Sequence, residues 1–176
     1  MINTDSYEKL KQWIPSVLLL PIAFLLVINH GKFIFILDHL NLLFHEGGHG
    51  IFRIFGKFIY TAGGSLMQII IPSLFIYYFL SNKKRIGAQI SLFYLAENLM
   101  NIGVYAADAR ARKLPLLGGN KVYHDWHYLL NKLGILDYCQ AVGFLFFYSA
   151  IAVLIIGIII PLVIKNYKES DIEMNL

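Results

Sequence analysis

Charged side chains are scarce in this sequence. Asp, Glu, Lys and Arg together make up 15 % of the 176 residues, whereas soluble domains carry about 25 %. Apolar residues make up 57 %, and they are gathered into long runs of the kind that cross a lipid bilayer. The composition therefore argues against a soluble domain and predicts an all-α integral membrane protein.

Cysteine is almost absent, and basic residues are not concentrated in one place. Cys139 is the only cysteine, which excludes an intrachain disulfide and a metal cluster held by cysteines. The formal net charge is only +4, and no basic patch is interleaved with aromatic residues as in nucleic-acid-binding surfaces. We therefore expect no nucleic-acid partner, and we expect basic loops that face anionic membrane lipids.

Five apolar stretches are long enough to form membrane helices. Their lengths of roughly 16 to 26 residues suit a hydrocarbon core about 30 Å thick. A shorter segment, residues 121–134, has apolar residues at helical spacing and is predicted to lie at the membrane interface. We predict about five transmembrane helices within a single membrane-embedded domain, residues 1–176, with the helices at about residues 14–29, 33–52, 65–80, 86–107 and 139–164.

The connections between these stretches carry two further signals. With five crossings, nine Lys and Arg residues fall on the side of the N-terminus and six on the other side, so the positive-inside rule favours a cytoplasmic N-terminus. The cluster "NKKR" on the other side opposes this bias. Residues 53–64 mix β-branched and aromatic residues with paired glycines, a pattern compatible with a short hairpin or a re-entrant loop.

The second stretch contains "HEGGH", which matches the pattern His-Glu-x-x-His. On a helix, His45 and His49 share one face and can bind one zinc ion. Glu46 lies beside them and can act as general base on a metal-bound water, whose pKa zinc lowers to about 7. The alternative is a buried cluster of His and Glu hydrogen bonds that joins two helices. Gly47 and Gly48 suit either close helix packing or room for a substrate backbone, and both interpretations remain open.

A catalytic zinc ion needs a third protein ligand and an open position. At about 1.5 Å per residue, Glu97 lies level with the two histidines, whereas Asp108 lies about 9 Å beyond them. His124 and Asp125 are adjacent, so one can bind the metal while the other orients a ligand. The pattern leaves five candidates open: Glu97, Asp108, His124, Asp125 and His127. His127 is equally explained as a polar residue on an interfacial helix.

Polar residues also line one face of the fourth stretch. Glu97, Asn101, Tyr105 and Asp108 follow helical spacing, and such a stripe is expected to face the interior of the bundle. Asn101 and Gln68 are polar at membrane depth, and we predict that they bind the substrate or the oxyanion. For Asn101 and Tyr105, hydrogen bonding between helices is the alternative.

The motif and the residues around it resemble known membrane proteins. "HEGGH" within a membrane helix, followed by "GG", resembles the intramembrane zinc metalloproteases of the site-2 protease class, whose third ligand is an aspartate on a later membrane segment. "HEGGHGIFRIFGKFIYTAGGSLMQIIIP", "NIGVYAADARARKLPLLGGN" and "HDW" resemble a group of small bacterial membrane proteins over about residues 13–136. This resemblance implies Asp108 or the "HDW" triplet as the source of the third ligand. The "LDG" element of the site-2 class is absent from this sequence.

Together these features predict a membrane-embedded zinc-dependent hydrolase, a metallopeptidase that cleaves peptide bonds in or near the membrane. The predicted zinc ligands are His45, His49 and Asp125, and the predicted base is Glu46. The expected cofactor is Zn²⁺, the expected partners are membrane lipids and a membrane-protein substrate, and the expected location is the bacterial inner (plasma) membrane. The alternative function is a non-enzymatic membrane scaffold or chaperone with a structural metal or a buried His–Glu cluster.

Overall fold

The computed structural model describes residues 10–114 and 123–164, and this part of the chain is mainly helical, with no β-strand. The prediction of an all-α fold is therefore confirmed for the described residues. Four predicted helices agree with the structure to within a few residues at each end. The elements are α2 (Ile14–Ile28), α3 (Phe35–Phe52), η1 (Arg53–Phe55), α4 (Gly56–Ser81), α5 (Arg85–Ala107), α6 (Asp125–Lys132), η3 (Leu136–Tyr138), α7 (Cys139–Ile159) and η4 (Ile160–Leu162).

Helix α5 lies at the centre of the bundle, packed between α4 and α7 and touching α2. Small residues let it approach α7 closely, because a Cβ on Gly103 would lie only 2.9 Å from the carbonyl oxygen of Gly143. The apolar core between these helices includes Ala96, Leu99, Met100, Ala150 and Leu154. This packing fixes the position of α5, and with it the side chains on the face of α5 that is turned toward α3 and α4.

Helices α3 and α4 form a helical hairpin that turns at η1. Gly56 starts α4 with φ of +84°, a backbone conformation that favours glycine. Above the turn the two helices pack backbone to backbone, because a Cβ on Gly48 would collide with the carbonyl group of Gly63. Gly48 therefore serves close helix packing, whereas a Cβ on Gly47 would meet no atom within 4 Å.

The prediction of a hairpin or re-entrant loop over residues 53–64 is wrong. Helix α4 begins at Gly56 and continues without a break to Ser81, so the third helix starts well before the predicted residue 65. The paired glycines that suggested a turn lie inside the helix. They are there because neighbouring groups on α3 leave no space for a side chain at either position.

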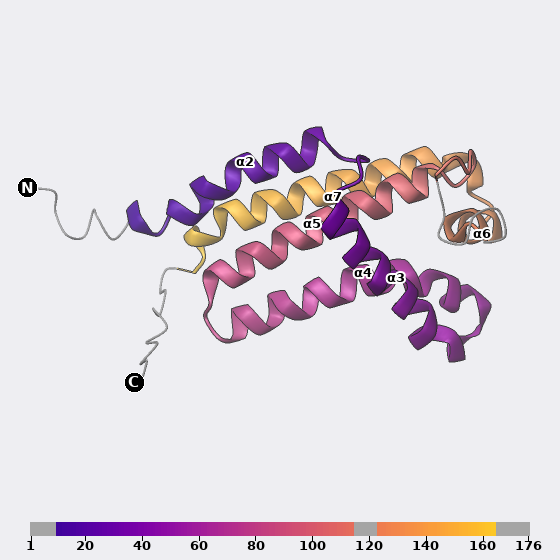
Figure 1. The fold of residues 1–176 in the computed structure, drawn as a ribbon, viewed down its shortest axis with the longest axis horizontal. Coiled ribbons are helices and arrows are strands. Elements are labelled where there is room, and N and C mark those ends of the chain that lie inside the picture. Colours follow the sequence, from indigo (N-terminus) through magenta and orange to yellow (C-terminus); the bar gives the residue numbers. More distant parts are fainter. Residues whose placement is uncertain (1–9, 115–122, 165–176) are drawn as a thin grey trace, which may run out of the picture.

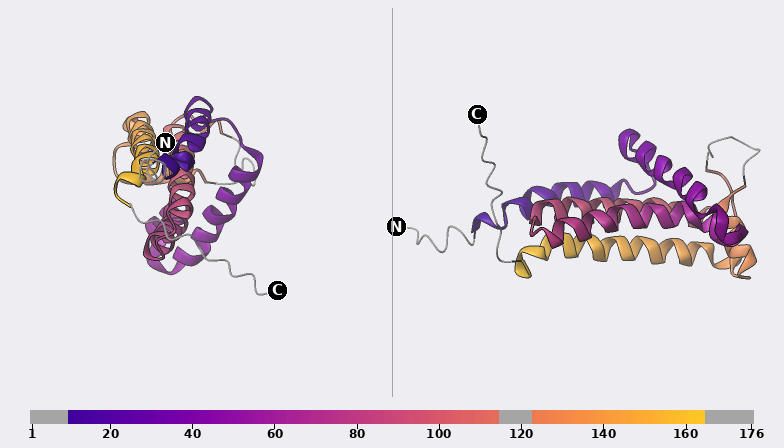
Figure 2. Two further views of the ribbon diagram at one scale, coloured as in Figure 1. Left: turned by 90° about the vertical axis from the view of Figure 1, so that its left-hand side faces the viewer. Right: turned by 90° about the horizontal axis from the view of Figure 1, so that it is seen from below.

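The directions of the first two long helices differ from the predicted alternation. Helix α2 runs along part of the bundle, and α3 starts partway along and crosses obliquely to the end where α6 lies (Figures 1 and 2). Both helices thus run toward the same end, and α4, α5 and α7 then alternate. The 15 residues of α2 extend about 23 Å, less than a hydrocarbon core of about 30 Å.

Two stretches of the described chain are long and apolar enough to cross a membrane. One is Phe35–Ser81, which comprises the α3–α4 hairpin, and the other is Leu136–Leu162, which comprises α7. Helix α2 is apolar but shorter. By length and composition, the described part of the chain thus contains helices that fit a membrane.

Candidate metal centre

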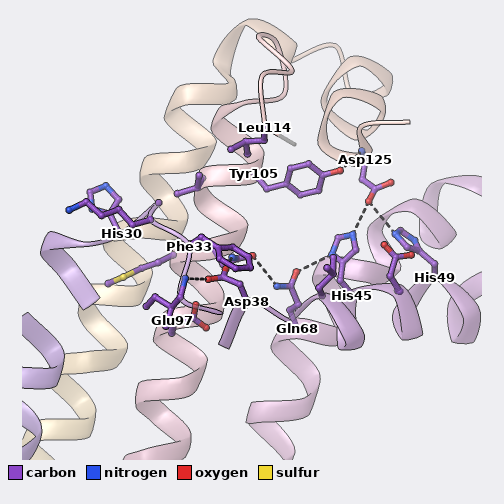
Figure 3. A pocket seen from close by; sticks show the side chains of 18 of the residues that line it. His30, Phe33, Asp38, His45, His49, Gln68, Glu97, Tyr105, Leu114 and Asp125 are labelled. Atoms are coloured by element: carbon purple, nitrogen blue, oxygen red, sulfur yellow. Dashed lines mark hydrogen bonds and ion pairs between the residues drawn. The ribbon is translucent and has the colours of Figure 1, made fainter. Parts of the chain in front are cut away.

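His45, His49 and Asp125 converge from two helices that are far apart in the sequence. The two histidines lie one turn apart near the end of α3, and Asp125 is the first residue of α6. Their ligand atoms all lie within 4.8 Å of one another. Nε2 of His45 is 2.9 Å and Nε2 of His49 is 3.2 Å from the same Oδ2 of Asp125 (Figure 3). The three residues predicted as zinc ligands are therefore brought together in the structure.

The second nitrogen of each imidazole faces a carbonyl oxygen. Nδ1 of His45 lies 3.0 Å from Oε1 of Gln68, and Nδ1 of His49 lies 2.8 Å from the backbone carbonyl of Tyr60. Because a carbonyl oxygen only accepts, each Nδ1 carries a proton. In a neutral imidazole the lone pair is then on Nε2, and both lone pairs point at a carboxylate oxygen. Such an arrangement is stabilised by positive charge between these atoms, supplied by a metal ion or by a proton.

This donor set fits zinc. Two imidazole nitrogens and one carboxylate oxygen match the three-ligand sets of catalytic zinc sites, which keep a fourth position open. Magnesium and calcium prefer sites made of oxygen atoms alone. The side chains of His45, His49 and Asp125 are 10 %, 13 % and 14 % exposed, so the centre is largely shielded from bulk water.

Gly64 of α4 makes room for the ring of His45. A Cβ on Gly64 would lie 2.5 Å from Cε1 and Nε2 of this imidazole, a separation far inside van der Waals contact. The second glycine of "GG" is therefore required for the imidazole of His45 to lie between α3 and α4. The sequence shows the pair of glycines, but the contact depends on how the two helices pack.

Helix α6 is held against the end of the bundle by contacts of its first two residues. The backbone N–H of Asp125 donates to the hydroxyl of Tyr105 at 3.1 Å, and the indole N–H of Trp126 donates to Oγ of Ser65 at 3.1 Å. Burial acts to raise the pKa of Asp125, but its hydrogen bonds with His45 and His49 outweigh burial and hold the pKa below the ordinary value. The carboxylate is therefore presented to the histidines in its charged form.

Asp108 and His124 form a pair separate from the group of His45, His49 and Asp125. The carboxylate of Asp108 accepts the backbone N–H groups of Lys113 at 3.0 Å and Leu114 at 2.9 Å. Its Oδ2 lies 3.4 Å from Nε2 of His124, and burial lowers the pKa of His124. Neither residue belongs to the group around His45, so the structure supports Asp125 rather than these two candidates.

The remaining two candidates also have other partners. Glu97 accepts a hydrogen bond from Nδ2 of Asn41 at 2.7 Å, and Nδ1 of His127 lies 2.8 Å from the carbonyl of Ala109. Counting residues along each helix places Glu97 level with the histidines only if the two helices are parallel and begin at the same depth in the membrane. Helix α3 instead crosses α5 obliquely (Figure 1), so Glu97 meets an earlier turn of α3.

A cavity of about 820 Å³ runs along the centre. Glu46 lines this cavity together with the three converging residues, and so do Gln68 and Asn101, which were predicted to bind substrate. The cavity continues past Glu97 to the loop between α2 and α3 (Figure 3). A molecule in this cavity would therefore face both the candidate metal ligands and the predicted base.

Two contacts of the site were not predicted from the sequence. Asp38 accepts a hydrogen bond from Nδ2 of Asn101 at 2.7 Å, and its position seven residues before His45, on the same face of a helix, is a signal that was available. The contact of His49 with Tyr60 uses a backbone carbonyl. Every residue has such a group, so no pattern of side chains predicts this contact.

No family model, curated protein or solved structure matches this chain. Its function is therefore inferred from the chemistry of the site. The resemblance to the site-2 protease class stays an expectation.

Proposed function

We propose that this protein is a membrane-embedded zinc-dependent hydrolase that cleaves peptide bonds in or near the membrane. The observation that carries the proposal is the convergence of the Nε2 atoms of His45 and His49 on one oxygen of Asp125. Since both Nδ1 atoms face carbonyl oxygens, the lone pairs are directed at the position of a cation. The predicted membership in the site-2 protease class is consistent with this chemistry and is part of the proposal.

Each residue has a separate task in the proposed reaction. His45, His49 and Asp125 would hold the metal through one atom each, as in catalytic zinc sites, which keep a fourth position for water or substrate. Zinc, when bound, lowers the pKa of water and polarises the carbonyl. Glu46, which lines the same cavity, accepts a proton from the attacking water and returns it to the leaving amine.

The apolar exterior supports a location in a membrane, for which we propose the bacterial inner membrane. On α7, for example, Phe144 is 58 % and Leu145 is 66 % exposed. Exposed apolar surface of this kind marks a binding or membrane surface in soluble proteins, and it suits contact with lipid. Membrane lipids are therefore the proposed surroundings, and a membrane protein is the proposed substrate.

Zinc content tests the metal centre directly. Protein purified in detergent at neutral pH is expected to bind one zinc ion per chain, measured by atomic emission, and H45A, H49A and D125A are each expected to lose it. Wild-type protein that binds no zinc would contradict the proposal.

Glu46→Gln tests the catalytic role. The variant keeps all three ligands, so it is expected to bind zinc as the wild type does and to lose cleavage of a mixture of membrane-spanning peptides, followed by mass spectrometry. Equal cleavage by this variant and the wild type would exclude Glu46 as the base. Zinc binding without any cleavage by the wild type would favour the membrane scaffold with a structural metal.

A further inference from the structure

A chain of hydrogen bonds leads away from the imidazole of His45. Its Nδ1 donates to Oε1 of Gln68 at 3.0 Å, Nε2 of Gln68 donates to Oδ1 of Asn101 at 3.2 Å, and Nδ2 of Asn101 donates to Oδ1 of Asp38 at 2.7 Å (Figure 3). Asp38 and His45 are both on α3, Gln68 is on α4, and Asn101 is on α5. The chain therefore links three of the helices that line the cavity.

The donors in this chain all point the same way, toward Asp38. An ionised carboxylate only accepts hydrogen bonds, so Asn101 must present its NH₂ group to Asp38 and its oxygen to Gln68. Gln68 must then present its NH₂ group to Asn101 and its oxygen to His45. This leaves one tautomer for a neutral His45, in which Nδ1 carries the proton and Nε2 carries the lone pair.

The carboxylate at the end of the chain is itself held in place. The backbone N–H of Ile34, at the start of α3, donates to Oδ2 of Asp38, so this oxygen is occupied and Oδ1 is left for Asn101. The first turn of a helix also favours a negative side chain. The chain therefore ends at a fixed acceptor, and the two amide groups between this acceptor and His45 cannot reverse independently.

We propose that Asp38, Asn101 and Gln68 are positioning residues for the metal centre, which set the tautomer of His45 and direct its Nε2 to the metal. This inference rests on the proposed zinc site and assigns a role to three residues outside the ligand set. It adds a role to the predicted substrate or oxyanion contact of Gln68 and Asn101, because each amide group keeps a second N–H and a second lone pair beyond the bonds in the chain. Loss of such an outer contact typically lowers metal affinity about 10- to 100-fold.

The test is a zinc competition titration of the full chain in detergent with a chromophoric chelator. Gln68→Met removes the acceptor for His45, and Asn101→Leu breaks the chain one residue further out. The matched control is Gln89→Met, because Gln89 is fully buried on α5 and is hydrogen-bonded to Ser16 and to the carbonyl of Gly157, but does not line the cavity.

Gln68→Met is expected to weaken zinc binding about 10- to 100-fold and Asn101→Leu to weaken it less, while Gln89→Met stays close to the wild type. The double variant Gln68→Met/Asn101→Leu is expected to bind as weakly as Gln68→Met alone, because both changes interrupt one series of contacts. The visible absorption bands of the Co²⁺-loaded protein are expected to shift in both chain variants and not in the control. A general loss of stability would not produce this spectral pattern.

Three outcomes would contradict the inference, and they differ from failure of the proposed function. Wild-type zinc affinity and an unchanged Co²⁺ spectrum in both chain variants would show that the chain does not position His45. Equal losses in Gln89→Met would show a general packing effect, and additive losses in the double variant would show that the two residues act separately. If wild-type protein bound no zinc, the zinc site itself would be wrong. If Gln68→Met does not fold, the zinc affinity and the Co²⁺ spectrum of Asn101→Leu test the inference alone. This variant keeps the contact between Gln68 and His45 and removes only the next bond of the chain.

Discussion

Adding one methyl group at Gly64 is expected to disable the metal centre without changing a ligand. In Gly64→Ala the new Cβ would lie 2.5 Å from Nε2 and Cε1 of His45, so the imidazole must move. Overpacking of this kind typically costs about 1–3 kcal/mol. The same movement would break the alignment of Nε2 with Asp125, now 2.9 Å, and of Nδ1 with Gln68, now 3.0 Å. We therefore expect zinc affinity to fall by at least about tenfold, which corresponds to about 1.4 kcal/mol.

The assay is the zinc competition titration, combined with thermal unfolding of the metal-free protein. Gly50→Ala is the matched control, because Gly50 is also helical and a Cβ there would meet no atom within 4 Å. The control is expected to bind zinc like the wild type and to be up to about 1 kcal/mol more stable, since alanine is the better helix former. Gly64→Ala with wild-type zinc affinity would refute the geometry of the centre described above.

Three further predictions follow from single contacts. Gly48→Ala is expected to destabilise the α3–α4 hairpin by about 1–3 kcal/mol, because the methyl group would collide with the carbonyl of Gly63; an unchanged melting temperature would contradict this packing. Trp126→Phe removes the N–H that donates to Ser65, so α6 is expected to be held less firmly by about 1 kcal/mol and zinc affinity to fall, whereas unchanged hydrogen exchange in α6 would count against it. The pKa of Asp125 is held below its ordinary value. Its ionised carboxylate therefore stabilises the metal-free protein above the unfolded-state pKa of about 3.9, and this stabilisation is lost as the pH falls through the lower folded-state pKa. The acid unfolding of D125N should lack this loss of stability, and identical acid transitions of D125N and the wild type would contradict the prediction.

Local patterns were sufficient for most of the helices and for His45 and His49, two of the three predicted metal ligands. Helix formation and the spacing of His45 and His49 depend on residues within one or two turns of each other, and the predicted stretches 33–52 and 86–107 agree closely with α3 and α5. The start of α4 was predicted wrongly because paired glycines, considered by themselves, indicate a turn. Here the glycines are inside a helix, where a second helix backbone lies against them.

The choice of Asp125 among five candidates depended on the packing of helices. Its contact with His45 spans 80 residues, and it exists because α3 crosses the bundle obliquely and α6 folds over the end of α3 and α4. The opening for the imidazole at Gly64 and the chain from Gln68 to Asp38 depend on the same crossing. Periodicity shows which face of a helix a residue is on, but the angle and offset between two helices arise from side chains of both. For this reason the spacing alone predicts the pair of histidines, whereas only the tertiary structure shows which of the candidates for the third position lies beside them.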